Sequence, residues 1–235
     1  MFLLSLAIGY SAWADEVSCS SDSTAINCGL TIDGDDTATI NADVTVSSGD
    51  AAIYLTTNNN TINMTGDVLT SGTSVEGIQF SGAADSNTIT LNGDITTTCA
   101  SGTGSNCFGI NLAGSSNTLT MTGNVSTAGS TARGLWINGD SHTVSLTGNI
   151  TSSTDSGLLF YGDNNTVTTV GNITAGAKAI DHFGATGNII KHTGNITTTL
   201  VNGYGAKSAN DNTMTIIGDI TTTNNSNFGF QNEGN

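Results

Sequence analysis

The chain contains no proline and only 4 lysine and arginine residues against 19 aspartate and glutamate residues, so its formal net charge is −15 at pH 7. A surface this acidic repels phosphate backbones and anionic lipid headgroups. The sequence therefore predicts no nucleic-acid partner. It also predicts no membrane span, because no apolar run approaches the length that crosses a bilayer as a helix.

Charged residues make up only 10% of the chain and aromatic residues 6%, whereas threonine, serine, asparagine and 30 glycines are abundant. Such a polar bias can indicate disorder. The apolar residues nevertheless keep a regular spacing, which a disordered segment does not do, and no helical periodicity appears after the N-terminal segment. We therefore expect an all-β fold.

Residues 1–14 are predicted to form a secretory signal peptide. Residues 2–9 are a short apolar stretch, and Ala12-Trp13-Ala14 fits the small-x-small pattern of a cleavage site after Ala14. The segment lacks the usual basic start, which suggests that the natural chain begins further upstream. A short buried strand is the alternative interpretation.

The four cysteines suggest two disulfides, as expected for a chain exported to an oxidising compartment. Cys19 and Cys28 lie in a predicted N-terminal cap over residues 15–35, and Cys99 and Cys107 lie in the longest insertion between repeats. Local pairing, Cys19 with Cys28 and Cys99 with Cys107, is favoured among the three connectivities. Metal binding is the alternative, but no nearby histidines have zinc-ligand spacing. The sequence predicts no metal site.

The strongest feature of the sequence is a repeat whose clearest copy reads Asn-Thr-Ile-Thr-Leu-Asn-Gly-Asp-Ile-Thr. Eight copies begin at intervals of 24, 27, 30, 25, 23, 23 and 24 residues, at Asp36, Asn60, Asn87, Asn117, His142, Asn165, Asn188 and Asn212. A period in this range indicates a solenoid, in which each unit buries its apolar side chains only by stacking on its neighbours.

Each repeat is predicted to supply three short strands. In residues 88–91 apolar residues alternate with threonine, which is the period of a half-buried strand. Gly93-Asp94 then makes a corner, and a second strand opens at Ile95. A third strand carries an apolar pair such as Ile110 and Leu112, preceded by Gly109. Coil length varies mainly between the second and third strands.

Stacked units of this kind form a parallel β-helix. We predict about eight coils of 23–30 residues over residues 36–235, with the apolar column inside and the threonine column outside. A right-handed helix is favoured, because the coils are long and uneven and hexapeptide spacing is absent. The chain ends in what resembles the last turn of a coil, so we expect the natural polypeptide to continue.

Two columns of polar residues are the candidate functional and structural features. The first is an asparagine ladder, in which stacked side chains bond along the rod, at Asn60, Asn87, Asn117, Asn165, Asn188 and Asn212. The second is a candidate binding face of outward threonines at Thr37, Thr39, Thr88, Thr90, Thr118, Thr120, Thr166, Thr168, Thr213 and Thr215. Asn63, Ser145, Ile189 and Lys191 interrupt this column. Regular threonine arrays occur in ice-binding β-solenoids, but β-propensity alone also explains exposed threonine.

A search for catalytic chemistry identifies no nucleophile motif, no phosphate loop and no cofactor site, so the sequence predicts a protein that is not an enzyme. The four basic residues fall in four different coils and show no shared face. Asp181, His182 and His192 are a weak candidate cluster on neighbouring coils, and Asp155 and Asp163 are a weak candidate carboxylate pair. The acid cluster at residues 33–36 is expected to be a solvated turn.

The signal peptide and the repeats resemble the passenger domains of bacterial autotransporters, over roughly residues 30–235. The resemblance implies a β-helical protein that is secreted or displayed on the bacterial surface through the periplasm. It also implies an outer-membrane β-barrel that follows the passenger. The expected function is that of a non-enzymatic adhesin that binds glycans or surfaces. Ice binding by the threonine column and a carbohydrate-active enzyme are the alternatives.

Overall fold

The structure is a computed structural model that describes residues 25–26, 29–32, 34, 37–47, 51–99, 106–201, 203–209, 211–224 and 227–233. Its described residues contain 26 strands in three parallel sheets and no helix. This confirms the predicted all-β parallel solenoid. The predicted signal peptide (residues 1–14), Cys19, Cys28 and most of the predicted cap lie outside the described residues.

The first sheet, sheet A, contains nine strands in the order β1 (Ala25–Ile26), β4 (Asp43–Val46), β7 (Val68–Gly72), β10 (Ile95–Cys99), β13 (Val125–Ala128), β16 (Ile150–Ser152), β19 (Ile173–Ala175), β22 (Ile196–Thr198) and β25 (Ile220–Thr222). Sheet B contains nine, in the order β2 (Leu30–Ile32), β5 (Ile53–Leu55), β8 (Glu76–Phe80), β11 (Asn106–Leu112), β14 (Thr131–Ile137), β17 (Ser156–Phe160), β20 (Lys178–His182), β23 (Tyr204–Ser208) and β26 (Phe228–Asn232). Sheet C contains eight, in the order β3 (Thr37–Ile40), β6 (Thr61–Thr65), β9 (Thr88–Asn92), β12 (Thr118–Thr122), β15 (Thr143–Thr147), β18 (Thr166–Val170), β21 (Ile189–Thr193) and β24 (Thr213–Ile217).

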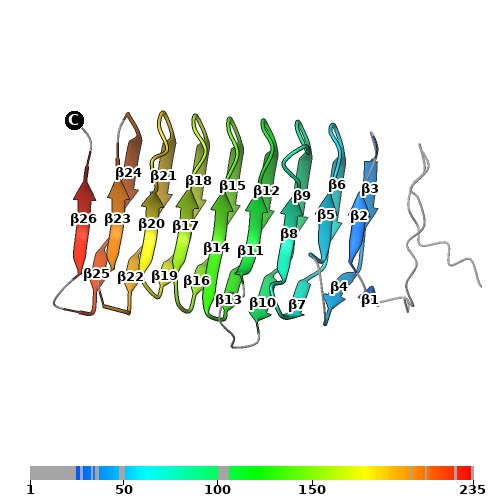
Figure 1. The fold of residues 1–235 in the computed structure, drawn as a ribbon. Coiled ribbons are helices and arrows are strands. Elements are labelled where there is room, and N and C mark those ends of the chain that lie inside the picture. Colours follow the sequence, from blue (N-terminus) through cyan, green and yellow to red (C-terminus); the bar gives the residue numbers. More distant parts are fainter. Residues whose placement is uncertain are drawn as a thin grey trace, which may run out of the picture.

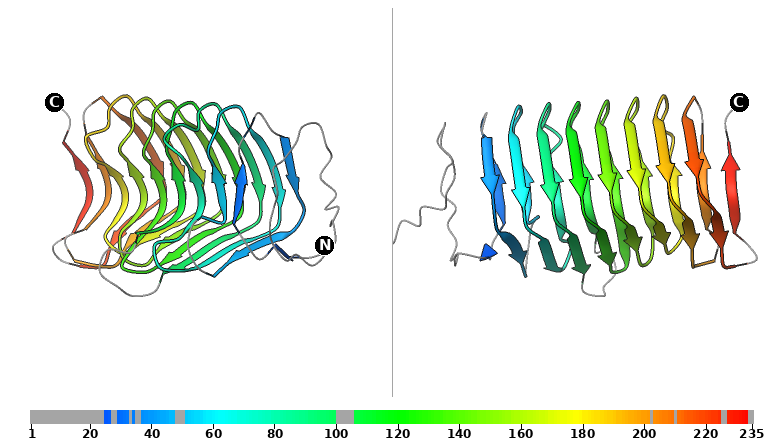
Figure 2. Two further views of the ribbon diagram at one scale, coloured as in Figure 1. Left: turned by 45° about the vertical axis from the view of Figure 1, so that its right-hand side comes forward. Right: turned by 180° about the vertical axis from the view of Figure 1, so that it is seen from behind.

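Each coil takes one strand from sheet C, one from sheet A and one from sheet B in turn. The eight coils run from β3–β4–β5 to β24–β25–β26, with β1 and β2 before them. Figure 1 shows the coils stacked side by side along the rod in sequence order, and Figure 2 shows the three sheets enclosing a common interior. Successive coils therefore contribute equivalent residues to each face.

The alternation in the sequence places the core as predicted. In β9, Ile89 and Leu91 are buried, and Thr88 and Thr90 point outward. Leu91 pairs in register with Met121 of the next coil. Repetition of this pattern builds one continuous apolar column from Leu30 to Ala206. Burial of this column supplies the main stabilisation of the rod, because no single coil can bury its own apolar face.

The corner between sheets C and A requires glycine. Gly123 adopts a φ of 145°, and an added Cβ would lie 2.0 Å from the carbonyl oxygen of Gly93 in the preceding coil. The backbones of adjacent coils therefore touch at this corner, and only a residue without a side chain fits.

A second glycine column explains the geometry of sheet B. An added Cβ at Gly134 would lie 2.4 Å from Cγ2 of Ile150, which is buried in the core. Gly134 and Leu135 therefore both face inward, and Trp136 is the next residue to face outward. This break in the strict alternation decides which side chains of sheet B reach the surface.

Two further predictions concern the cysteines and the membrane. Cys99, at the end of β10, is bonded to Cys107 of β11, which confirms the predicted local pairing at this insertion. Together with Val75 and Ala132 the two cysteines form a small apolar cluster apart from the main core. No helix among the described residues is long and apolar enough to cross a membrane.

Candidate functional site

The predicted asparagine residues lie in a column, the Asn ladder, just before each strand of sheet C. Asn60, Asn87, Asn117, Asn165 and Asn188 are almost completely buried. Oδ1 of Asn117 accepts hydrogen bonds from the backbone N–H of Asn87 at 2.8 Å and from its Nδ2 at 3.0 Å. Nδ2 of Asn117 donates to the carbonyl oxygens of Ala84 and Ala113. One side chain thus satisfies four buried groups and joins consecutive coils.

His142 occupies the ladder position that the sequence analysis omitted. Its Nδ1 accepts a hydrogen bond from the backbone N–H of Asn117 at 3.1 Å, and its own backbone N–H donates to Oδ1 of Asn165 at 2.7 Å. Burial lowers the pKa of His142 to about 4. The neutral ring is required here, because protonation of Nδ1 would remove the acceptor that Asn117 uses.

A second ladder lies at the exposed corner between sheets C and A. The backbone N–H of Asn124 donates to Oδ1 of Asp94, and the backbone N–H of Asn149 donates to Oδ1 of Asn124. The strands of sheet C are therefore bounded by a hydrogen-bonded column at each end. This arrangement fixes their length and register from coil to coil.

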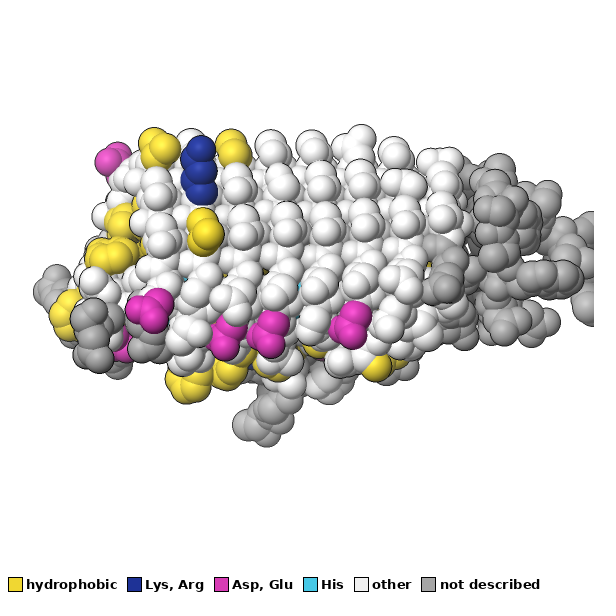
Figure 3. All heavy atoms as spheres, turned by 90° about the horizontal axis from the view of Figure 1, so that it is seen from above, with side chains coloured by type: hydrophobic (Ala, Val, Ile, Leu, Met, Phe, Trp, Pro, Cys, Tyr) yellow, Lys and Arg dark blue, Asp and Glu magenta, His cyan; other side chains and the backbone are white. Residues whose placement is uncertain are grey.

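The outer face of sheet C, here called the hydroxyl face, contains all the predicted threonines. They belong to two columns in register: Thr37, Thr61, Thr88, Thr118, Thr143, Thr166, Ile189 and Thr213, and Thr39, Asn63, Thr90, Thr120, Ser145, Thr168, Lys191 and Thr215. A third column, which sequence reasoning missed, is Thr65, Asn92, Thr122, Thr147, Val170, Thr193 and Ile217. Figure 3 shows this face as an array of mostly uncharged polar side chains.

The spacing of the hydroxyl face follows from the sheet itself. Neighbours along a column are about 4.8 Å apart and adjacent columns are about 6.6 Å apart, because these are the strand separation and twice the rise per residue. Lys191 is the one charged member of the three columns. The face is therefore a two-dimensional lattice of short hydroxyl side chains.

The outer face of sheet B is different, since it carries large aromatic side chains. Four of them form a diagonal line over successive coils, here called the aromatic stripe: Phe108, Trp136, Tyr161 and Phe183. Their ring centroids are 4.8, 5.9 and 5.0 Å apart in that order. Phe108 is buried, whereas Tyr161 is 42% and Phe183 is 55% exposed. The stripe thus offers ring surface to solvent at one end and is anchored at the other.

The prediction about the four basic residues is corrected in two respects: Lys191 of β21 and Lys207 of β23 lie in the same coil, and three of the four residues share a face, whereas Lys191 lies on sheet C. Arg133, Lys178 and Lys207 all lie on the outer face of sheet B, because they occupy outward positions of β14, β20 and β23. Each is paired with a carboxylate: Arg133 with Asp155 at 2.9 Å, Lys178 with Asp181 at 3.0 Å and Lys207 with Glu233 at 2.7 Å. The Arg133 guanidinium also lies 5.3 Å from the Trp136 ring centroid. The paired cations leave this face close to neutral.

Three neighbouring side chains on this face have polar atoms that remain unpaired. Nδ2 of Asn111 donates to Oε1 of Glu76 at 3.4 Å. Oε2 of Glu76, Oδ1 of Asn111 and Nε1 of Trp136 are buried and make no hydrogen bond in the part of the chain that the structure describes. Burial raises the pKa of Glu76 to about 7, although the hydrogen bond from Asn111 opposes this shift. We call these residues the Glu76 cluster.

The carboxylate pair does not assemble, and the residues of the Asp181, His182 and His192 cluster each contact other partners, with Asp181 bound to Lys178. Asp155 binds Arg133 before β17, whereas Asp163 follows β17 and accepts from the backbone N–H of Thr186. His182 stacks on Phe160 inside the rod, and His192 contacts Thr169 in sheet C.

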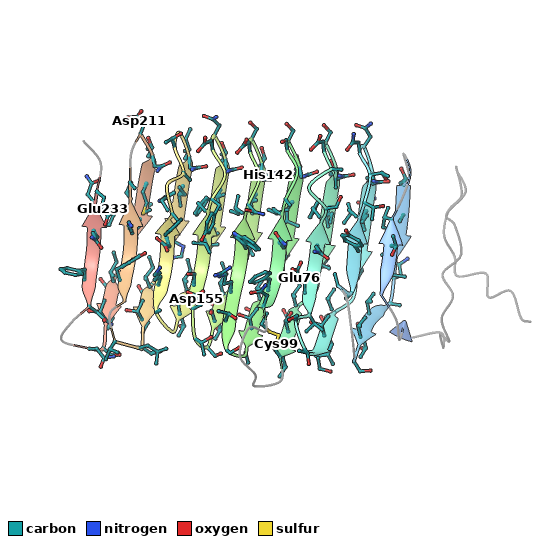
Figure 4. All side chains as sticks on the ribbon, in the orientation of Figure 1. Glu76, Cys99, His142, Asp155, Asp211 and Glu233 are labelled. Carbon is teal, nitrogen blue, oxygen red and sulfur yellow. A yellow bond between two sulfur atoms is a disulfide. The ribbon has the colours of Figure 1, made fainter. Side chains whose placement is uncertain are left out.

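A second carboxylate pair is also too widely separated. Glu76 and Asp155 are labelled in Figure 4 on the sheet B side of the rod. Their coils are three strands apart in sheet order, from β8 to β17. This is roughly 14 Å at the usual strand spacing, beyond the ~6.5–9.5 Å that separates the carboxyl groups of inverting glycosidases.

No protein-family model, no curated protein and no solved structure matches this chain.

Sequence reasoning found the hydroxyl face but missed the aromatic stripe and the Glu76 cluster. The sequence pattern of the third strand rests on its inward residues, such as Ile110 and Leu112. It makes no prediction for the outward residue between them, Asn111. The sequence feature that could have identified the outward position is a repeated four-residue pattern in this strand: a glycine, an apolar residue, a variable residue and a second apolar residue. The variable position is the one that carries Asn111, Trp136 and Lys207.

Proposed function

We propose that this protein is a secreted or surface-displayed binding module of the autotransporter-passenger type, without enzymatic activity, and that it binds neutral glycans through the outer face of sheet B. The observation that carries the proposal is the aromatic stripe. Rings exposed beside hydrogen-bonding side chains suit sugars, whose C–H faces pack on aromatic rings while their hydroxyls bond to polar groups.

The charge of the sheet B face supports a neutral ligand. Arg133, Lys178 and Lys207 are each held by a carboxylate, so no unpaired cation among them is free to recruit an acidic sugar. The net charge of −15 also opposes the approach of polyanions. A neutral polysaccharide avoids both penalties.

The test is retention of the purified protein on immobilised neutral and acidic polysaccharides: cellulose, laminarin and galactomannan against alginate. We expect retention on at least one neutral polymer and none on alginate. Tyr161→Ala combined with Phe183→Ala should reduce retention at least tenfold, because these rings are the exposed end of the stripe.

The matched control is Val170→Ala combined with Ile217→Ala on the hydroxyl face. These side chains are 44% and 55% exposed, close to the values for Tyr161 and Phe183. The control should bind normally. Equal loss in both double variants, or no retention of the wild type, contradicts the proposal, and release of sugar products with or without calcium indicates an enzyme instead.

Ice binding by the hydroxyl face is the second candidate, and the observation that favours it is the register of three hydroxyl columns over the coils of sheet C. Short hydroxyl and methyl groups on a rigid lattice can order the adjoining water layer. The face needs no ligand pocket for this role.

The ice-binding candidate is tested with Thr90→Tyr combined with Thr120→Tyr, two adjacent positions of one column. Wild type should shape growing ice crystals and this variant should not. Thr96→Tyr combined with Ser126→Tyr is the control, since these residues are also adjacent partners but lie on sheet A. Unshaped ice with wild-type protein rejects the candidate.

A further inference from the structure

We propose that the Glu76 cluster is a hydrogen-bonding subsite that binds hydroxyl groups of one sugar ring next to the aromatic stripe. The inference rests on the proposed glycan binding and adds the residues that set its specificity. Its members come from β8, β11 and β14, three successive strands of sheet B, so they lie together without any loop.

The chemistry of the three unpaired atoms identifies the ligand class. Oδ1 of Asn111 and, in the ionised form, Oε2 of Glu76 are acceptors, and the indole Nε1–H of Trp136 is a donor. A metal ion has no use for an indole donor, and an anion is repelled by the two acceptors. A hydroxyl group both donates and accepts, so vicinal hydroxyls of a neutral sugar match all three atoms.

The position of the cluster also fits a sugar on the stripe. Asn111 pairs in register with Trp136, whose ring is the second member of the stripe. Asn111 is only 6% exposed and Trp136 and Glu76 are half-buried, and the three unpaired atoms themselves are covered by neighbouring side chains or backbone. A sugar ring that packs beside Trp136 therefore reaches these atoms only when the half-buried side chains of Trp136 and Glu76 turn aside.

Buried polar atoms without partners are uncommon in native proteins, and each calls for an explanation. An ordered water molecule is the competing explanation for this cluster. The two explanations differ in one respect: loss of the polar atoms weakens sugar binding only if the sugar itself contacts them.

The experiment measures the affinity of cellohexaose, laminarihexaose and mannohexaose for the full chain by titration calorimetry. Trp136→Phe keeps an aromatic ring but removes the donor, and Asn111→Leu removes the acceptor at similar volume. We expect each change to weaken binding of the preferred hexasaccharide about tenfold, as for loss of one good hydrogen bond. The melting temperature of each variant, measured by circular dichroism, verifies that it is folded.

Gln79→Leu is the matched control, because Gln79 is the register partner of Asn111 on the other side but lies outside the cluster. It should bind like the wild type. Unchanged affinity in Trp136→Phe and Asn111→Leu, together with loss in Tyr161→Ala, would overturn the subsite while leaving glycan binding intact. If the wild type binds none of the three sugars, both the subsite and the proposed function fail.

Discussion

The outer faces of sheets B and C are made by the same coils, yet they carry different chemistry. On sheet C, equivalent positions repeat almost the same short residue, as in Thr88, Thr118 and Thr143. On sheet B, equivalent positions change from coil to coil, as in Asn111, Trp136 and Leu159. A solenoid can thus keep one face periodic and make another specific without altering the core between them.

The boundaries of the two sheets account for this difference. Each strand of sheet C starts at the Asn ladder and ends at a glycine corner with its own ladder, so its length is fixed at both ends. Sheet B follows the segments whose length varies, including the disulfide-bonded insertion between β10 and β11. The fixed strand length favours the same residue at equivalent positions of sheet C. The variable segments before sheet B allow different residues at its equivalent positions.

The largest expected effect comes from breaking the ladder on which both faces depend. Asn117→Ala removes the acceptor for Asn87 and the donor for two carbonyl groups. Because each unsatisfied buried group costs ~1–3 kcal/mol, we expect a loss of roughly 3–6 kcal/mol in the free energy of unfolding. Urea titration followed by circular dichroism measures it.

Asn124→Ala is the control for the ladder prediction, since it removes the same kind of side chain from the exposed corner. Water replaces the lost bonds there, so we expect a loss below about 1 kcal/mol. Equal losses in the two variants would show that burial of the ladder is unimportant.

Glu76→Gln tests the difference between the two faces, because the carboxyl of Glu76 lies in a desolvated position on sheet B, whereas the described residues of the hydroxyl face on sheet C carry no carboxyl group. Burial raises the pKa of Glu76 to about 7, above the ordinary value of 4.5. Folding therefore favours the protonated carboxyl. The resulting contribution to the free energy of unfolding is complete below pH 4.5 and is lost as the pH rises through 7. Glutamine should stabilise the protein by about 1–3 kcal/mol at pH 8 and leave it unchanged at pH 4. Thermal melting at both pH values gives the comparison, and stabilisation of the same size at pH 4 would contradict this explanation.

His142→Asn tests a pKa shift in the opposite direction, in the Asn ladder at the edge of sheet C. Burial lowers the pKa of His142 to about 4, below the ordinary 6.5, so its contribution is present above pH 6.5 and is lost as the pH falls toward 4. Asparagine, the residue of the other ladder positions, does not titrate. We expect the variant to gain about 1–2 kcal/mol relative to wild type between pH 7 and pH 4.5. A pH-independent difference in melting temperature would refute this assignment.

The smallest effect is expected from completing the hydroxyl face with Ile189→Thr combined with Lys191→Thr. Both side chains are exposed on β21, so the free energy of unfolding should change by less than ~0.5 kcal/mol. Denaturant unfolding measures this. A large destabilisation would mean that these residues support the rod rather than interrupt a regular face.

The sequence alone determined the repeat, the number of coils, the inward column and the hydroxyl face. These follow from a period of 23–30 residues and from strict alternation in residues such as Thr88 to Leu91, which are local properties of the chain. The Asn ladder positions were equally legible, except for His142, because the ladder requires only a short acceptor at that point. The pairing of Cys99 with Cys107 followed from their proximity in the chain.

Only the tertiary structure decided the sheet B face. The two successive inward residues, such as Gly134 and Leu135, shift the alternation, and the shift exists because Ile150 from sheet A fills the space beside the glycine. The aromatic stripe then joins residues from four coils, and Arg133, Lys178 and Lys207 share one face because each occupies an outward position of a sheet B strand. The number of residues between two positions in the sequence does not predict how close their side chains lie on this face, because that number includes the loops as well as the strands.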